Sequence, residues 1–414
     1  MNRTAKIKRK SKENGMSSQV VIVSVAAGGG HKTAMYSLGQ SLARFAPSLV
    51  PTYFESHIED LEKAHRVVYS KFTRAYDFFY DMTDSDWLRR LYFMTTSALV
   101  AKMKAEMRPL FDSHARLIIS THFMQTYALL QLKRELNSSA KIVAYIPDFD
   151  ESMVHFPEVK GNIPDAVIAQ SPRLLQKLAQ KYKLPKTATV QAGYIPRAEF
   201  SDARKQSPKI ARENLSRIDA PLAKHIQTEL FTLVATGGTF WVESLYDALE
   251  PLARSSAFDW TRSQLIIACG NNKTAYQKYK SLGERHGVGI IPLPFLNYAQ
   301  MALLFRSASA VVLSGVAPAT LYELLETDAG PISIYRINPG PEKFNLAYVC
   351  QKQLAEFTPD AALLRARLAQ LSRAPDEVVQ QKQAFCKAAL NERKEALARA
   401  EQMASFIERL ATSL

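Results

Sequence analysis

The sequence is poor in cysteine and has no long apolar run. Its 414 residues include three cysteines, Cys269, Cys350 and Cys386, which are widely spaced and form no Cys-x-x-Cys pair. This usage excludes a disulfide scaffold and a cysteine-based zinc site, and it suits a reducing compartment. No apolar run reaches the ~18–20 residues of a membrane-spanning helix, and residues 1–19 lack the apolar region of a secretory signal. We therefore expect a cytoplasmic protein with no integral membrane segment.

Negative charge is also scarce. Lys and Arg number 53 against 39 Asp and Glu, which gives a formal net charge of +14. Such an excess favours a polyanionic partner: nucleic acid, an anionic membrane surface or a nucleotide-type substrate. Part of it lies in residues 1–18, which predict either a disordered, solvated tail or a basic tether for acidic lipid head groups. No nucleic acid is expected as a partner, because the aromatic residues are not interleaved with Lys and Arg.

Short apolar runs alternate with helical patterns along the whole chain. Residues 19–25 are almost all Val and Ile without polar alternation, as in a strand buried on both faces. Strands separated by helices predict an α/β fold with two open parallel sheets in tandem, divided near residue 200. Ligands of such sheets bind beyond the carboxyl ends of the strands, so the cleft between the two is the expected site. The expected strands are 19–25, 49–54, 117–120, 141–145, 166–169 and 189–191, then 230–235, 264–268, 289–291, 310–313 and 331–335.

Two segments depart from this alternation. Residues 57–107 predict helices without a strand and are rich in aromatic side chains. These aromatics are either ordinary core or part of an inserted helical subdomain that faces a lipid or membrane. After Pro375 the sequence predicts helix to the end.

Glycine-rich turns follow several expected strands. Gly28-Gly29-Gly30-His31 lies at a strand-to-helix junction, where glycines allow close approach of a ligand and the helix N-terminus favours an anion. A titratable His31 there indicates a catalytic or ligand-binding site. In the second half, residues 235–239, 268–272 and 313–323 form similar turns, which together predict a phosphate and nucleoside pocket. Glu323 is placed either to accept hydrogen bonds from a ribose diol or to act as a favourable charge near a helix N-terminus.

Six segments, in this order and spacing, resemble the monogalactosyldiacylglycerol synthase and processive diacylglycerol glucosyltransferase family, relatives of the peptidoglycan transferase that makes lipid II. They are Gly28–His31, Ala75-Tyr76-Asp77 through Leu91-Tyr92, Ser120-Thr121-His122, Pro147-Asp148 through Val154-His155, Gly193-Tyr194-Ile195-Pro196-Arg197, and Pro318–Glu323 followed by residues 338–345.

The resemblance implies a GT-B fold with two Rossmann-like domains. The acceptor lipid would bind the N-terminal domain (19–200, with the helical insert at about 57–107), and a UDP-sugar would bind the C-terminal domain (201–375). The terminal helices (376–414) would pack back on the N-terminal domain. The implied reaction moves a hexose to diacylglycerol or a glycosyl-diacylglycerol at the cytoplasmic membrane face, with the enzyme peripherally bound there. It needs no metal and no cofactor besides the UDP-sugar co-substrate, because backbone amides and a helix N-terminus stabilise the leaving diphosphate.

The catalytic base of such a reaction must deprotonate the acceptor hydroxyl. His31 and Asp148 are the candidates by position, with His155 and His122 as second choices. Asp148-Phe149-Asp150 reads Asp-x-Asp, but it falls in the acceptor half, so we discount metal binding there. Donor binding is expected at Gly28, Gly29, Gly30, Arg197, Gly237, Gly238, Thr239, Gly270, Asn271, Phe295, Leu296, Pro318, Ala319, Thr320, Glu323, Glu342 and Asn345. Acceptor binding is expected at Tyr76, Tyr92, His122 and His155.

The donor loops depart from the family pattern. Ala317 and Ala319 stand where the family has glycine, which would reshape the phosphate loop if either position required a positive φ. Pro341 stands where the family has an amide that binds sugar hydroxyls. Two alternatives therefore stay open: the same fold acting on a polyprenyl-linked or soluble acceptor, and a non-catalytic protein that binds UDP-sugars.

Overall fold

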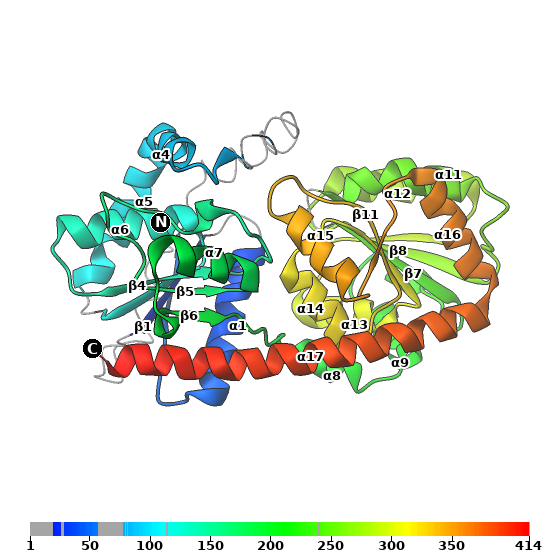
Figure 1. Ribbon diagram of the computed structural model, residues 1–414. Coiled ribbons are helices and arrows are strands. Elements are labelled where there is room, and N and C mark those ends of the chain that lie inside the picture. The colour runs from blue at the N-terminus through cyan, green and yellow to red at the C-terminus, as the bar shows by residue number, and fades with distance from the viewer. Residues whose placement is uncertain are drawn as a thin grey trace, which may run out of the picture.

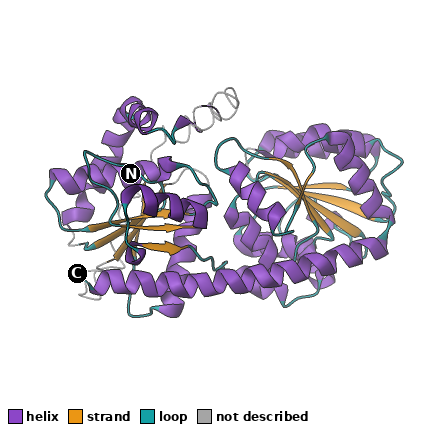
Figure 2. Ribbon diagram, viewed as in Figure 1, coloured by secondary structure: helices purple, strands orange, loops and turns teal. Residues whose placement is uncertain are grey.

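The computed structural model describes residues 20–25, 29–56, 78, 80, 82–112, 115–237 and 241–413. Figure 1 shows two α/β lobes side by side, with one long helix running along both. Each lobe has a central sheet with helices on its two faces (Figure 2). The fold class expected from the sequence is confirmed.

The N-terminal lobe is built on a six-stranded parallel sheet in the order β2-β1-β3-β4-β5-β6. Its central strands are apolar on both faces and buried, as residues sandwiched between two helical layers must be. The strands are β1 (Val20–Val25), β2 (Thr52–Ser56), β3 (Leu117–Ser120), β4 (Lys141–Ile146), β5 (Ala166–Ala169) and β6 (Thr189–Gln191). The helices are α1 (Gly29–Phe45), α4 (Asp86–Thr95), α5 (Ser97–Asp112), α6 (Phe123–Glu135) and α7 (Pro172–Tyr182), with short 3₁₀ helices η1 (Met153–His155) and η2 (Lys186–Ala188).

The C-terminal lobe repeats this plan with the strand order β12-β11-β10-β7-β8-β9, again all parallel. The strands are β7 (Phe231–Thr236), β8 (Ser263–Ala268), β9 (Ile290–Leu293), β10 (Ala310–Ser314), β11 (Ile332–Arg336) and β12 (Glu356–Phe357). The helices are α8 (Ala198–Arg204), α9 (Pro208–Ser216), α11 (Tyr246–Ala253), α12 (Lys273–His286), α13 (Tyr298–Ser307), α14 (Pro318–Glu326), α15 (Glu342–Gln351) and α16 (Ala361–Arg373), with 3₁₀ helices η3 (Ala223–His225) and η4 (Val242–Leu245).

The strand predictions hold with two differences. The strand expected at 49–54 begins instead at Thr52, because the backbone N–H of Leu49 still donates to Ala46 in the turn that ends α1. The short edge strand β12 was not predicted, since two residues give no periodic pattern.

Helix α17 (Pro375–Thr412) is 38 residues long, which corresponds to roughly 57 Å. It contacts α14 and α16 in the C-terminal lobe and α1 and β6 in the N-terminal lobe (Figure 1). Gly193, just after β6, lies so close to it that an added Cβ would be 2.0 Å from the backbone nitrogen of Ala400. Glycine is therefore required where the chain passes under α17.

Most of the described part of the aromatic insert lies in α4 and α5, and the aromatic side chains of α4 divide between two roles. Phe93 on α4 is buried in the lobe. Trp87, Leu91 and Met94 on the same helix are 68%, 42% and 70% exposed, and their spacing places them on one outward stripe. Among the helices that the structure describes, none is long and apolar enough to cross a bilayer.

Candidate active site

The order of the N-terminal sheet brings the predicted catalytic residues together. Strands β1, β3 and β4 are neighbours, and their carboxyl ends lead to His31, His122 and Asp148 respectively. Parallel strands end at the same edge of a sheet, so these side chains face one region.

His31, in the first turn of α1, is held by the strand end next to it. Its Nδ1 lies 2.7 Å from the carbonyl oxygen of Thr121, and its ring meets that of His122 edge-on with centroids 4.8 Å apart. Since a carbonyl only accepts, Nδ1 carries the proton and Nε2 is the nitrogen that can take one up. Burial lowers the pKa of His31 below its usual value, opposed in part by the negative charge of Asp148. A neutral imidazole at neutral pH is the state that a general base requires.

Asp148 is joined to the other lobe by Asn345 of α15. The Asn345 side-chain amide donates to Asp148 Oδ1 over 3.0 Å and to the carbonyl of Val316 over 3.0 Å. Its oxygen accepts from the backbone N–H of Phe149 over 2.9 Å. The ring of Phe149 also stacks on Tyr348 with centroids 3.6 Å apart. The loop after β4 and helix α15 therefore form a direct contact between the two lobes.

Glu342, at the start of α15, organises the loop after β10. Its carboxylate accepts from the backbone N–H groups of Val316 and Asn338, over 2.9 and 2.8 Å. Burial raises the pKa of Glu342 to about 7, although these N–H donors oppose the shift.

The residue with left-handed backbone conformation in the loop after β10 is Gly315, with φ of 96°, whereas Ala317 has φ of −79°. Alanine is thus unstrained at position 317, and Ala319 lies within α14.

Glu323 and Arg197 meet where the linker between the lobes passes α14. Arg197 Nη1 lies 3.5 Å from Glu323 Oε1, and the guanidinium lies over the ring of Tyr298, 3.7 Å from its centroid. Burial raises the pKa of Glu323 to about 8, with Arg197 opposing. The buried Nη2 of Arg197 has no hydrogen-bond partner among the described residues. A buried guanidinium N–H without an acceptor is suited to a phosphate oxygen.

A buried cluster beside the cleft was not predicted. His155 Nε2 lies 2.6 Å from Asp150 Oδ2, and the hydroxyl of Tyr80 donates to the same carboxylate. Burial alone would raise the pKa of Asp150 and lower that of His155. The opposite charge of the partner outweighs burial in each case, so the pKa of Asp150 is lowered and that of His155 is raised. Asp150 follows Asp148 by two residues, a signal that we interpreted only as an Asp-x-Asp motif. The two carboxylates make separate contacts, and no group of three or more His, Cys, Asp or Glu in the described residues is arranged to hold a metal.

Three predicted acceptor residues surround Phe123, the first residue of α6. His122 stacks on it at 4.6 Å between centroids, His155 meets it edge-on at 5.6 Å, and the ring of Tyr92 lies 6.0 Å away. Phe123 itself was not predicted, because an aromatic residue at a helix start is indistinguishable from core in the sequence. The fourth predicted acceptor residue, Tyr76, lies outside the described residues.

The remaining donor predictions fall mostly on the carboxyl-end loops of the C-terminal sheet. Gly237 follows β7, Gly270 and Asn271 follow β8, Phe295 and Leu296 follow β9, Pro318, Ala319 and Thr320 form the first turn of α14, and Gly29 and Gly30 begin α1. Strands β10, β7, β8 and β9 are consecutive in the sheet, so their loops share one edge. Phe295 is 62% exposed, whereas Leu296 is buried. Gly28, Gly238 and Thr239 lie outside the described residues.

No protein-family model matches this sequence, and no curated protein matches it. Solved structures, in contrast, match almost the whole chain. Anabaena HepE in complex with UDP and glucose is 12% identical, with a TM-score of 0.53, over 96% of this chain and 100% of that one. The spinosyn rhamnosyltransferase SpnG is 12% identical, with a TM-score of 0.54, over 94% and 99%. UDP-GlcNAc 2-epimerase from Neisseria meningitidis, bound to UDP-GlcNAc, is 9% identical, with a TM-score of 0.53, over 89% and 97%.

These similarities show that the chain has the GT-B glycosyltransferase fold over nearly its whole length. The expectation of this fold is confirmed, while the narrower resemblance to the diacylglycerol glycosyltransferases stays a prediction. Because the same fold includes an epimerase, the reaction must be argued from the site rather than from the fold.

Proposed function

We propose that this protein is a glycosyltransferase that moves a hexose from a UDP-sugar to a lipid acceptor at a membrane surface. The observation that carries the proposal is the contact between two sets of residues, one from each lobe. His31 and Asp148 come from the carboxyl edge of one sheet, while Glu342 and Asn345 follow the carboxyl edge of the other. A transfer between two substrates needs such a site, where each lobe holds one of them.

The acceptor is activated by His31. As the acceptor hydroxyl attacks the anomeric carbon of the sugar, its proton passes to Nε2 of His31, whose Nδ1–H is fixed by Thr121. A bond forms between the hydroxyl oxygen and the anomeric carbon, and the bond from that carbon to the β-phosphate oxygen breaks. UDP leaves with the electron pair. Asp148 stabilises the imidazolium that forms, since its charge already acts on His31.

The donor lies against the C-terminal lobe. Glu323 binds the ribose diol, and the partnerless Nη2 of Arg197 binds the diphosphate. The N-terminus of α14 adds backbone N–H groups and a positive dipole end for the leaving group. Glu342 shapes the loop that faces the sugar.

The acceptor is a lipid, diacylglycerol or a glycosyl-diacylglycerol by resemblance, and it reaches the site from the membrane. Helix α4 supports this side of the proposal, because its stripe of Trp87, Leu91 and Met94 is exposed. An apolar stripe with an aromatic end and a neighbouring cation, Arg90, is suited to lie in the interface of a bilayer. The net charge of +14 favours an anionic surface, which supports binding at the cytoplasmic membrane face.

The experiment is a transfer assay with vesicles that contain diacylglycerol and a set of UDP-sugars, in which free UDP and glycolipid are both measured. We expect glycolipid with one sugar and its loss in His31→Ala. UDP binding with no product on diacylglycerol, polyprenyl phosphate or soluble acceptors would identify a non-catalytic binding protein instead. Absence of UDP binding would overturn the proposal altogether.

A further inference from the structure

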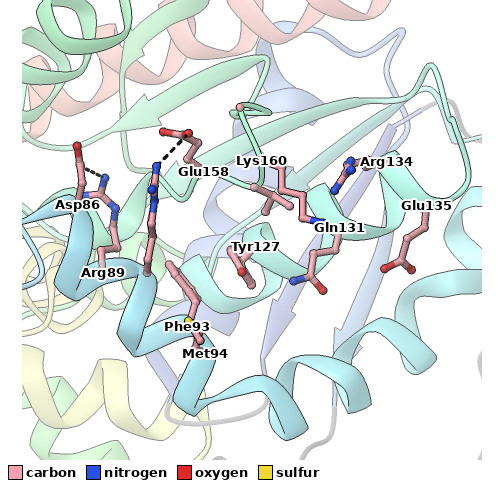
Figure 3. Close-up of a pocket in the computed structure, with 13 residues that line it drawn as sticks. Asp86, Arg89, Phe93, Met94, Tyr127, Gln131, Arg134, Glu135, Glu158 and Lys160 are labelled. Carbon is pink, nitrogen blue, oxygen red and sulfur yellow. Dashed lines mark hydrogen bonds and ion pairs between the residues drawn. The ribbon is translucent and has the colours of Figure 1, made fainter.

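A cavity of about 850 Å³ lies on the N-terminal lobe between α4, α6 and residues 158–161 (Figure 3). Arg134 and Met94 line it, and Met94 also belongs to the outward stripe of α4. This cavity is therefore part of the membrane side of the proposed function. A second cavity, of about 360 Å³, lies on the C-terminal lobe between the end of α15 and helix α17. Among the described residues that line it, none has been assigned to catalysis or to substrate binding.

One wall of this second cavity is a stripe of α17 that combines small and polar side chains. Ala384 and Ala388 lie one helical turn apart, and their small side chains leave the hollow. Lys387 and Asn391, also one turn apart, lie beside them. Both side chains are exposed, and neither forms an ion pair or a hydrogen bond with another side chain that the structure describes. The wall thus has an unpaired ammonium group and an unpaired amide.

The second wall group without a partner is a buried carboxylate oxygen. Glu392 is 2% exposed, and its Oε1 accepts from the hydroxyl of Tyr322 over 3.1 Å and from Arg399 Nη2 over 2.6 Å. Its Oε2 has no hydrogen-bond partner in the described part of the chain. Lys352 Nζ lies 3.7 Å from this oxygen and donates instead to Glu395 over 2.7 Å. A buried carboxylate oxygen that lacks a donor is costly, so the N–H group of a ligand is favoured there.

We propose that this cavity binds a free α-amino acid, whose ammonium group pairs with Glu392 and whose carboxylate pairs with Lys387. A zwitterion supplies the opposite charge to both groups, whereas a simple cation would meet Lys387 and a simple anion would meet Glu392. The Asn391 amide adds a donor for the carboxylate of the ligand. The cavity volume is in the lower part of the ~300–1,000 Å³ range of small-molecule sites, which suits a ligand of this size.

Helix α15 joins this cavity to the proposed active site. Asn345 and Tyr348 contact the loop after β4 that carries Asp148. Lys352 follows Asn345 by seven residues, about 10 Å along the helix axis, and lines the cavity. The ammonium group of the ligand takes the place at Glu392 that Lys352 approaches, so binding moves this end of α15. The amino acid is therefore a regulator of donor binding, a role that rests on the proposed function, whereas its binding does not.

The test is calorimetric titration of the full chain with L-alanine, L-glutamine, L-glutamate and L-arginine. The tightest of the four is then compared with its N-acetyl derivative, which lacks the ammonium group, and with its α-amide, which lacks the α-carboxylate. Lys387→Gln removes the unpaired cation, and the matched control Lys394→Gln removes another exposed cation of α17 that does not line the cavity. Glu392→Gln removes the buried charge. Because Glu392 also contacts Tyr322, the unfolding midpoint of each variant is measured alongside.

We expect at least one of the four amino acids to bind the native chain and Lys394→Gln alike. Both blocked derivatives should bind at least about tenfold more weakly, and so should the amino acid to Lys387→Gln and Glu392→Gln. Absence of saturable binding by all four amino acids, equal affinity of the blocked derivatives, or an equal loss in Lys394→Gln would overturn the inference.

The regulatory part is tested by reciprocity. Saturation with the amino acid should change the Kd for UDP by about fivefold or more, and saturation with UDP should change the Kd for the amino acid by the same factor. An unchanged Kd for UDP would overturn this part. A chain that binds the amino acid but fails to bind UDP would keep the new site and remove the proposed transferase function.

Discussion

The side-chain amide of Asn345, on the C-terminal lobe, donates a hydrogen bond of 3.0 Å to the carboxylate of Asp148, on the N-terminal lobe. All the hydrogen-bonding atoms of this buried amide are engaged by Asp148, Phe149 and Val316. We therefore expect Asn345 to orient Asp148 in the proposed reaction.

Asn345→Ala tests this role. The substitution leaves the Phe149 N–H and the Asp148 carboxylate without their partner, so we expect kcat to fall about tenfold or more. The KM for the UDP-sugar should change little. Steady-state kinetics with both substrates varied separates the two constants. A raised donor KM with unchanged kcat would assign Asn345 to sugar binding instead.

His31→Ala should lower kcat/KM by about 10²–10⁴, the usual contribution of a positioned general base. In the native enzyme the acidic limb of the pH–rate profile should have its midpoint below 6.5, because burial lowers the pKa of His31. Asp148→Asn removes a charge that raises this pKa, so its midpoint should move further toward acid. UDP binding, measured on both variants, serves as the control. An unchanged profile in Asp148→Asn would show that the limb belongs to another group.

Glu323 couples stability to pH. Its pKa is about 8 in the folded chain against 4.5 in the unfolded one, so the folded state keeps a proton that the unfolded state has lost. The free energy of unfolding should therefore fall as pH rises from about 4.5 to 8, by at most ~1.4 kcal/mol per pH unit from this group. Glu323→Gln should remove that slope in urea titrations at several pH values. Glu199→Gln removes only a minor contribution to the raised pKa of Glu323 and should retain most of the slope. Equal slopes in all three proteins would contradict the assignment.

The Asp150–His155 pair is expected to stabilise the lobe. His155→Gln leaves the fully buried carboxylate of Asp150 without its counter-charge, which costs roughly 3–5 kcal/mol. The native pair is complete between the two unfolded pKa values, about pH 4 to 6.5, since the pKa of Asp150 is lowered and that of His155 raised. Chemical denaturation in this window measures the loss. A cost below ~1 kcal/mol would mean that the pair contributes no more than a surface ion pair.

Membrane binding through α4 predicts a contrast between two double variants. Trp87→Ser/Met94→Ser removes two exposed apolar side chains from α4, and partitioning to anionic vesicles should fall at least tenfold. Leu363→Ser/Val379→Ser removes side chains of similar exposure from α16 and α17 and should leave partitioning unchanged. Vesicle co-sedimentation provides the comparison. Equal partitioning of the two variants would exclude α4 as the docking element.

The sequence alone was sufficient to predict where the strands lie and at which edge of each sheet their carboxyl ends meet. Val20–Val25 and Leu117–Ser120 are apolar except for one serine each, because both faces are covered, and this pattern is visible without the structure. Once the strands are placed, parallel topology brings His31 and Asp148 to one edge. Parallel topology likewise places the loops that follow β10 and β7 at one edge of the second sheet.

Contacts that depend on the direction of side chains were not predictable. Asp148 and Asp150 look alike in the sequence, yet one faces Asn345 and the other His155. The cavity beside Arg134 arises only when α4 packs on α6, and no local pattern encodes that packing. The sequence predicts a reshaped phosphate loop if Ala317 replaces a glycine with positive φ. In the structure the residue with positive φ is Gly315, and Ala317 has an ordinary negative φ.

Helix α17 has a consequence for how the chain is made. Its residues Met403, Phe406 and Ile407 belong to the same core as Val20 and Ile22 of β1. The first lobe therefore cannot complete its core on the ribosome until almost the whole sequence has been synthesised. Because the same helix buries Phe385 and Ala389 in the other lobe, the two lobes should melt in a single cooperative transition rather than one after the other.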